Sequence, residues 1–282
     1  MKKQIRILII LLIGLKAISC TERINIDLDE SDIRLVVEGS VTTDTMVHKV
    51  ILSETTSYYY SQKAPVVTGA SVSIRGGGSI IQLHESAPGV YETDSTFFGI
   101  VGEAYTLDIE LESAVGGFSE FSATSVMSEK VSIDSLQLLF HPDWSEEGFW
   151  EVKCFFQDPP SADYYRFLVS INGKLLSDTL DKWFVSDDRF FSGGYVDGAS
   201  VAFLDQGSED EILNAGDTVT IELDCIGRDY AGFIFEAQAE LMGSNPLFSG
   251  PPANVTGNIS NGAIGFFSAY TTSRARVRAG DK

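Results

Sequence analysis

The sequence predicts an all-β protein with two β-sandwich-like domains, the N-terminal one immunoglobulin-like, and with one helix in the C-terminal domain. Short runs of alternating apolar and polar residues recur from Arg34 onward, and turn residues separate them. Helical periodicity is absent from the first half of this region and occurs once in the second half. The 263 residues that follow a predicted leader are too many for one small sandwich, which supports two domains.

Residues 1–19 are predicted to be a lipoprotein signal peptide that is cleaved before Cys20. Three basic residues flank an unbroken apolar run over 7–13, which is too short to span a bilayer. The four residues AISC that end at Cys20 are similar to a bacterial lipobox, so we expect Cys20 to carry the lipid. An ordinary signal peptide with an incidental cysteine is the alternative, because Lys16 and Ala17 depart from the usual pattern.

Residues 20–33 are polar and acidic, and we interpret them as a tether between the lipid and the first domain. The immunoglobulin-like sandwich is expected over 34–128. Its predicted strands are LVVEGSV, KVILSET, ASVSIR, SIIQL, GVYET and AYTLDIEL. The run Gly76-Gly77-Gly78 predicts a hairpin between the third and fourth of these strands.

The second sandwich-like domain is expected over 129–282, beginning with VSIDSLQLLF. Asn172-Gly173 marks a tight hairpin within it. A helix is predicted near 229–242, because apolar side chains recur there at intervals of four, and Asp229 is its expected N-cap. A proline-rich loop then leads into a last strand within GAIGFFSAY.

Seven segments distributed along the chain are informative when taken together. They are NPLFSGPPANVTGNISNGAIGFFSAY, CTERINIDL, LVVEGSVT, PVVTGASVSI, GVYET, GEAYTLDIEL and VSIDSL. In their order along the chain they resemble the domain-of-unknown-function family 4249, lipoproteins of Bacteroidetes. The long C-terminal segment is the most specific of them, since many immunoglobulin-like modules share the early β pattern.

The resemblance implies a lipid-anchored protein of the outer membrane, on its periplasmic face or at the cell surface. It also implies a TonB-dependent outer-membrane receptor as partner, and a non-enzymatic accessory role in ligand capture for uptake. Two alternatives stay open, a surface adhesin or scaffold and a carbohydrate-active enzyme that uses two of the many carboxylates. The family supplies no catalytic residues that could be carried over.

The charge of the chain argues against nucleic acid and anionic lipid surfaces as partners. Removing residues 1–19 takes away four basic and no acidic residues, which leaves 16 Lys and Arg against 40 Asp and Glu, a net charge of −24. The three histidines, His48, His84 and His141, lie on separate predicted segments, and neither HExxH-like nor G-x-S-x-G spacing occurs in the sequence. We therefore expect no enzymatic activity.

No cofactor is expected apart from calcium, which the acidic stretches leave open. Asp187 and Asp188 in VSDDRFF are the first choice for calcium ligands, and the acidic loop over 205–211 is the second. Neither stretch has EF-hand spacing, and a solvated acidic loop is the alternative for both.

Aromatic clusters are the candidate ligand-binding residues. Tyr58, Tyr59 and Tyr60 are consecutive, so at least one must face outward from a strand. Trp144 and Trp150 in HPDWSEEGFW raise the same expectation. Packing inside the sandwiches is the alternative.

Cys154 and Cys225 both lie on the apolar phase of predicted strands, which fits either a disulfide or two buried thiols. Five triplets that begin with Asp-Ser or Asp-Thr, four of them ending in an apolar residue, are similar to short O-glycosylation sites of Bacteroidetes. Their acceptors are Thr45, Ser95, Ser135, Thr179 and Thr218.

Overall fold

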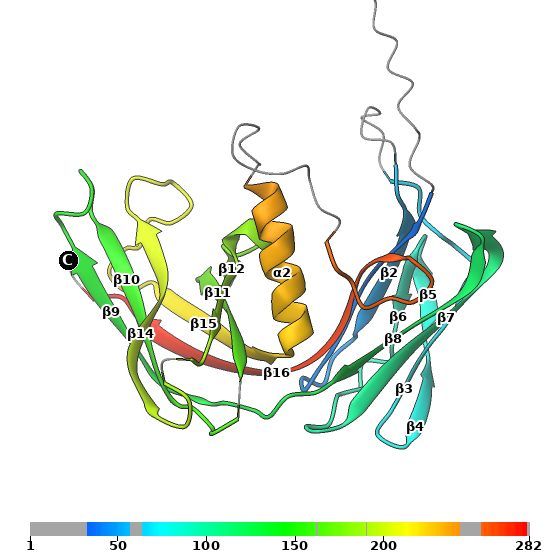
Figure 1. Ribbon diagram of the computed structural model, residues 1–282. Helices are drawn as coiled ribbons and strands as arrows, with labels where there is room; N and C mark the ends of the chain where they lie inside the picture. The colour runs from blue at the N-terminus through cyan, green and yellow to red at the C-terminus, as the bar shows by residue number, and fades with distance from the viewer. Residues whose placement is uncertain (1–32, 57–63, 162, 190, 243–254, 281–282) are drawn as a thin grey trace, which may run out of the picture. The chain divides into compact units, whose positions relative to one another are not determined.

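Strands make up most of the regular structure, as the alternating pattern predicts (Figure 1). The computed structural model describes residues 33–56, 64–161, 163–189, 191–242 and 255–280. These residues all belong to one compact unit of the chain, residues 32–282. The predicted signal peptide, the tether up to residue 32 with Cys20, and the Tyr58–Tyr60 cluster lie outside the described residues.

The described strands form three sheets. The long sheet runs in the order β12 (Lys174–Leu175), β11 (Tyr164–Ile171), β15 (Thr218–Ile226), β16 (Ile264–Arg278), β1 (Leu35–Thr42), β2 (Lys49–Glu54), β6 (Val90–Glu92) and β5 (His84–Ala87), and β13 (Phe184–Asp187) also pairs with β11. A four-stranded sheet has the order β4 (Ser79–Gln82), β3 (Ser71–Gly76), β7 (Ala104–Val115) and β8 (Phe118–Val126). A three-stranded sheet has the order β14 (Tyr195–Asp205), β10 (Phe149–Gln157) and β9 (Ile133–His141).

Each smaller sheet buries apolar side chains against one part of the long sheet. The first core combines side chains of β1, β2 and β6 with those of β3, β7 and β8, for example Val37, Leu52 and Leu107. The second core combines β11 and β15 with β10 and β14, for example Phe167 and Phe156. Fully burying one such side chain stabilises the fold by about 1.5–3 kcal/mol. The prediction of an all-β, sandwich-like fold is confirmed.

Strand β16 takes part in both sandwiches, which corrects the expected division into 34–128 and 129–282. Its first half pairs in parallel with β1, and its second half pairs antiparallel with β15. Figure 1 shows β16 running along both halves of the molecule. Phe267 and Ala269 accordingly belong to the first core, whereas Ala279 belongs to the second. The alternation of apolar residues marks this strand but does not reveal its partners.

The two predicted hairpins are confirmed. Gly77 and Gly78 connect β3 and β4 with φ angles of 57° and 77°. Asn172 and Gly173 connect β11 and β12 with φ angles of 50° and 84°. Two successive positive φ angles belong to a tight hairpin turn whose twist matches that of the strands, and glycine and asparagine adopt them at little cost.

The predicted helix is α2 (Arg228–Leu241), which packs against β11, β13, β16 and the short 3-10 helix η1 (Leu180–Lys182). Its N-cap is Gly227, not Asp229, and Asp229 lies in the first turn, where a negative charge is favourable near the helix N-terminus. Ala231 and Ile234 are fully buried under the helix. In the part of the chain that the structure describes, no helix has the length and apolarity needed to cross a membrane.

Cys154 and Cys225 are both buried free thiols, so the disulfide interpretation is wrong. Cys154 lies on β10 and Cys225 on β15, in opposite sheets of the second core. Burial raises the pKa of Cys154 to about 12 and that of Cys225 to about 11. The apolar phase that both residues occupy therefore reflects packing rather than a bond between them.

Candidate functional site

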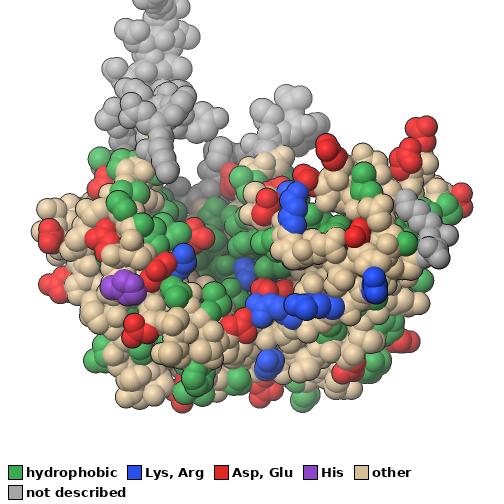
Figure 2. Space-filling model, turned by 180° about the vertical axis from the view of Figure 1, so that it is seen from behind, with side chains coloured by type: hydrophobic (Ala, Val, Ile, Leu, Met, Phe, Trp, Pro, Cys, Tyr) green, Lys and Arg blue, Asp and Glu red, His purple; other side chains and the backbone are tan. Residues whose placement is uncertain are grey.

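A row of arginines on β16 is the first surface feature. Arg274, Arg276 and Arg278 are all exposed, because every second residue of a strand faces the same side. Figure 2 shows Lys and Arg side chains gathered in a short band beside a hollow, whereas acidic side chains are scattered. Arg274 pairs with Asp44 at 2.7 Å and with Glu222 at 2.6 Å. These ion pairs tie β16 to β15 and to the turn after β1, which gives Arg274 a structural role.

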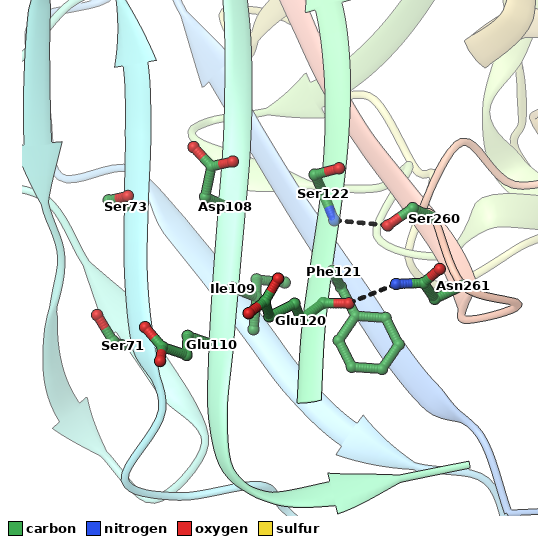
Figure 3. A pocket seen from close by; sticks show the side chains of 10 residues that line it. All are labelled: Ser71, Ser73, Asp108, Ile109, Glu110, Glu120, Phe121, Ser122, Ser260 and Asn261. Carbon is green, nitrogen blue, oxygen red and sulfur yellow. Dashed lines mark hydrogen bonds between the residues drawn. The ribbon is translucent and has the colours of Figure 1, made fainter. Parts of the chain in front are cut away.

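A polar hollow of about 350 Å³ lies against the outer face of β3, β7 and β8 (Figure 3). Its carboxylates include Asp108, which binds Arg75 at 2.6 Å. The Ser122 amide donates to the Ser260 hydroxyl at 2.8 Å, and the Asn261 side chain donates to the Glu120 carbonyl at 2.7 Å. The loop before β16 therefore docks on β8 at one side of the hollow, and these contacts engage part of its polar lining.

A groove of about 310 Å³ lies between β13 with η1 on one side and β14 on the other. β14 is an edge strand of its sheet, and β13 lies at the edge of β11, so the second sandwich is open here. Buried Phe167 and Leu204 line its interior. Phe184 and Phe203 are 44% and 49% exposed, although both line the groove. Large aromatic side chains at this exposure favour a binding surface over core packing.

Polar groups stand at the rim of this groove. Asp181, Lys182 and Glu211 contribute to its lining, together with the half-buried ring of Trp183. The Trp183 indole donates to the Ser177 carbonyl at 3.1 Å, which holds the ring in place. An apolar groove with a few fixed polar groups is the usual composition of a ligand site.

Trp144 extends the aromatic surface of the groove, because its ring lies 5.8 Å from that of Phe203. The Trp144 ring is 53% exposed and stacks on His141, with the centroids 3.8 Å apart and the planes 8° apart. His141 Nε2 binds Glu151 Oε2 at 2.7 Å, and Ser200 donates to the same carboxylate. The Ser200 hydrogen bond, followed by that of His141, holds the pKa of Glu151 below its ordinary value. Three strands thus orient one exposed indole ring.

Trp150, the other predicted ligand-binding tryptophan, lies in the second core, which corrects that expectation. It is buried on β10 and packs against Phe140, with the ring centroids 5.1 Å apart. Trp144 and Trp150 belong to the same hairpin, but Trp144 is in the turn and Trp150 is on the inward phase of the strand. Of the predicted aromatic residues that the structure describes, only Trp144 remains a surface candidate.

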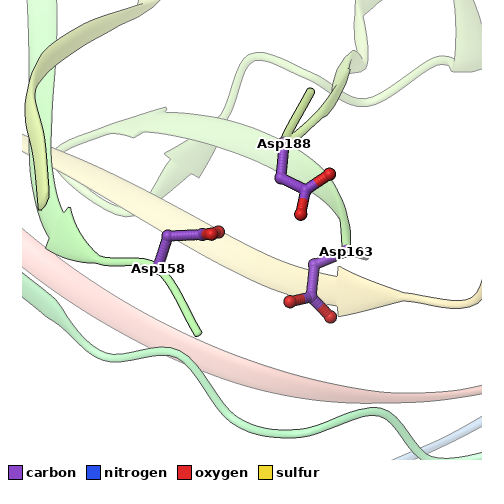
Figure 4. Close-up of side chains that lie close together, drawn as sticks. All are labelled: Asp158, Asp163 and Asp188. Carbon is purple, nitrogen blue, oxygen red and sulfur yellow. The ribbon is translucent and has the colours of Figure 1, made fainter. Parts of the chain in front are cut away.

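Three aspartates form an acidic cluster at one end of the second sandwich (Figure 4). Asp158 follows β10, Asp163 precedes β11 and Asp188 follows β13, and each offers an oxygen within 4.8 Å of the others. Asp158 and Asp188 are buried, and Asp163 is half-buried. Burial and the charges of Asp158, Asp188 and Glu129 raise the pKa of Asp163. The structure thus brings one predicted calcium ligand, Asp188, together with two aspartates that were not predicted.

The other predicted calcium ligands lie elsewhere. The Asp187 carboxylate binds Arg189 at 2.7 Å and is absent from the cluster. In the loop over 205–211, Glu211 accepts a hydrogen bond from the Asp205 amide at 2.8 Å, and Asp210 pairs with a lysine. These contacts stabilise the loop at both places.

A buried ion pair joins β11 and β15 of the long sheet beneath helix α2, and Arg166 Nη1 also donates to the Tyr230 hydroxyl of the helix at 3.3 Å. Arg166 donates from Nη2 and Nε to one oxygen of Asp224, at 2.7 and 3.0 Å, and the Thr272 hydroxyl donates to the other at 2.8 Å. The guanidinium carbon lies 4.4 Å from the ring centre of Trp183 and 4.8 Å from that of Tyr270. Although burial opposes it, the Asp224 charge holds the pKa of Arg166 above its ordinary value. This network packs under η1 and the helix, beside the groove.

The predicted O-glycosylation acceptors differ in exposure. Thr45, Ser95, Ser135 and Thr179 are exposed, whereas Thr218 is half-buried within β15. The first four are therefore accessible to a modifying enzyme in the folded protein, and Thr218 is the least accessible.

The residues that sequence reasoning missed are Phe184 and Phe203 of the groove and Asp158 and Asp163 of the cluster. In SVAFLD, Phe203 falls on the outward phase of the strand, a signal that was available in the sequence. In QDPPSAD, two aspartates flank a short proline turn between two strands, which brings their side chains to one end of the sheets. The contribution of Asp188 depends on the pairing of β13 with β11, which the sequence does not reveal.

Comparison with protein families gives one match that covers most of the chain. The model of a family described as a domain of unknown function (DUF4249) matches residues 21–276. Comparison with curated proteins found no match. The matched region contains every described strand except the last residues of β16, along with the groove and the acidic cluster. The chain therefore belongs to the DUF4249 family.

Proposed function

We propose that this protein is a non-enzymatic, lipid-anchored component of the outer membrane that captures a ligand for a TonB-dependent uptake receptor. The observation that carries ligand capture is the groove between β13 and β14, with Phe184 and Phe203 at its opening and Trp144 beside them. The lipobox-like residues before Cys20 support the membrane anchor. The resemblance of the sequence to lipoproteins associated with such receptors supports the partner.

The occupant that we propose for the groove is an oligosaccharide. Aromatic rings can stack on the C–H faces of sugar rings, and Trp144 is held rigidly enough by His141 to act as such a platform. Asp181, Lys182 and Glu211 at the rim supply acceptors and donors for sugar hydroxyl groups. A neutral glycan also avoids the repulsion that an anionic ligand would meet from a chain with a net charge of −24 after cleavage.

Ligand capture is tested by a glycan microarray followed by calorimetry with its strongest binder. Trp144→Ala and Phe203→Ala should each weaken binding about tenfold, since truncating an aromatic anchor costs at least about 1.4 kcal/mol. Phe98→Ala is the matched control, because Phe98 is 51% exposed but lies in the first sandwich. Equal binding by all three variants and the unaltered protein would place the glycan elsewhere. Absence of any bound glycan would refute the proposed ligand.

The accessory role is tested separately by purifying the protein from its native outer membrane in mild detergent. A TonB-dependent receptor should be recovered with it in stoichiometric amount. Recovery of the protein alone would contradict the receptor partnership and leave the adhesin and enzyme alternatives. The glycan result and the receptor result are independent, so either half of the proposal can fail alone.

A further inference from the structure

The acidic cluster defined by Asp158, Asp163 and Asp188 concentrates negative charge without a basic partner. None of the ion pairs among the described residues includes any of the three. Two of the carboxylates are buried and the third is half-buried, so water screens their repulsion poorly. A buried group of like charges requires a counter-ion or protons to be stable.

A second observation points to a ligand at this position. Asp188 is only 5% exposed, and its Oδ2 atom is buried without a hydrogen-bond partner. Figure 4 shows the Asp188 carboxylate directed into the space between the three residues. A buried charged oxygen without a hydrogen-bond partner is strongly unfavourable, so such an atom needs an explanation.

The protein itself orders the other two carboxylates. Asp158 accepts hydrogen bonds from the Tyr165 hydroxyl and, at 2.8 Å, from the Gly193 amide. Asp163 accepts one from the Ser161 hydroxyl at 2.8 Å. The cluster is therefore a preorganised set of oxygens rather than a group of mobile surface side chains.

We propose that Asp158, Asp163 and Asp188 bind a divalent cation, and that this cation is calcium. All the donors are carboxylate oxygens, which hard cations prefer, and the cluster contains no histidine or cysteine of the kind that zinc or copper favours. Calcium lies about 2.3–2.6 Å from its oxygens, so two ligands on opposite sides of the ion are about 4.6–5.2 Å apart. The oxygens of the cluster, all within 4.8 Å of one another, fit that range.

A cation here would join two segments that are distant in the sequence, the turn that carries Asp158 and Asp163 and the end of β13 at Asp188. Asp158 follows the central strand of the three-stranded sheet, whereas Asp163 and Asp188 adjoin β11 and β13 of the long sheet. Calcium would therefore connect the two sheets of the second sandwich at one end. It would also restrain β13, whose first residue, Phe184, lines the groove.

The test uses the full-length protein in mild detergent, stripped with a chelator and then titrated with CaCl₂ by calorimetry and by thermal unfolding. We expect one calcium ion per chain and an increase in the melting temperature of several degrees at saturation. Asp188→Asn and Asp163→Asn should each weaken calcium binding at least about tenfold. Asp187→Asn is the matched control, since Asp187 is adjacent in sequence and acidic but pairs with Arg189, and it should bind within about twofold of the unaltered protein.

The apo proteins give a further readout. Without calcium, Asp188→Asn should melt at or above the temperature of the unaltered protein, because it removes repulsion, and it should lose the calcium-induced increase. If Asp188→Asn does not fold, Asp163→Asn decides the matter, since Asp163 is half-buried. The proposal is overturned if calcium gives neither heat nor a change in melting temperature. It is equally overturned if both cluster variants bind calcium as well as Asp187→Asn does.

Discussion

Replacing Arg166 with methionine tests how much the buried Arg166–Asp224 ion pair stabilises the fold. Methionine keeps much of the side-chain volume and removes the charge. It leaves Asp224, which is fully buried, with the Thr272 hydroxyl as a remaining hydrogen-bond donor. The side chains of Arg166 and Asp224 are 4% and 0% exposed, so little water can replace the lost guanidinium.

The expected loss in the free energy of unfolding is about 3–5 kcal/mol, the usual cost of removing one partner from a buried pair. The aromatic rings around the guanidinium add to this loss, because a desolvated cation over a ring contributes up to about 2 kcal/mol. For a chain of this size the melting temperature should fall by roughly 6–20 °C.

Thermal and urea unfolding, followed by tryptophan fluorescence, measure the effect. Lys182→Met is the matched control, because Lys182 and Asp178 form an ion pair whose side chains are 54% and 58% exposed. That substitution should leave the stability nearly unchanged, because exposed ion pairs contribute little. A loss below about 1 kcal/mol for Arg166→Met would refute the reasoning, since the pair would then behave like the exposed one.

Three further predictions concern other parts of the fold. Gly265→Ala should destabilise the protein by at least about 2–3 kcal/mol in urea unfolding, because φ is 106° there and an added Cβ would lie 1.9 Å from the Val37 carbonyl oxygen. Unchanged stability would contradict the parallel register of β1 and β16. Cys154 and Cys225 should resist a thiol reagent in the native protein at pH 8 and both react in denaturant, and native labelling of either would contradict their burial. Burial lowers the pKa of His48 below its ordinary value of about 6.5. As the pH falls through that value, the unfolded chain binds more protons than the folded one, so the free energy of unfolding should decrease. His48→Gln should reduce the slope of the free energy of unfolding against pH, measured between pH 7.5 and pH 5.

Local features of the fold could be predicted from the sequence because they depend on neighbouring residues. The paired positive-φ positions at Gly77-Gly78 and Asn172-Gly173 identify their hairpins directly. The spacing of apolar residues identifies α2 to within one residue at each end. Its N-cap could not be predicted from residue type, since Gly227 serves through backbone conformation alone.

Features that depend on pairing between distant strands could not be predicted. The dual role of β16 and the position of β13 follow from strand order in the long sheet, which the alternating pattern leaves undetermined. The same limit explains the candidate sites. The exposure of Trp144 depends on its place in a local turn, whereas the approach of Asp188 to Asp158 requires the folded sheets.

The place of β16 along the chain has a consequence for how the protein is made. Residues 264–278 are synthesised after all the other described strands. They nevertheless supply Phe267 to the first core and pair with β15, which belongs to the second core. Neither sandwich can close until this strand has left the ribosome, so the nascent chain keeps apolar surface exposed throughout synthesis. For a protein bound for export, as residues 1–19 predict, this late strand would delay folding until synthesis is complete and would favour a translocation-competent chain.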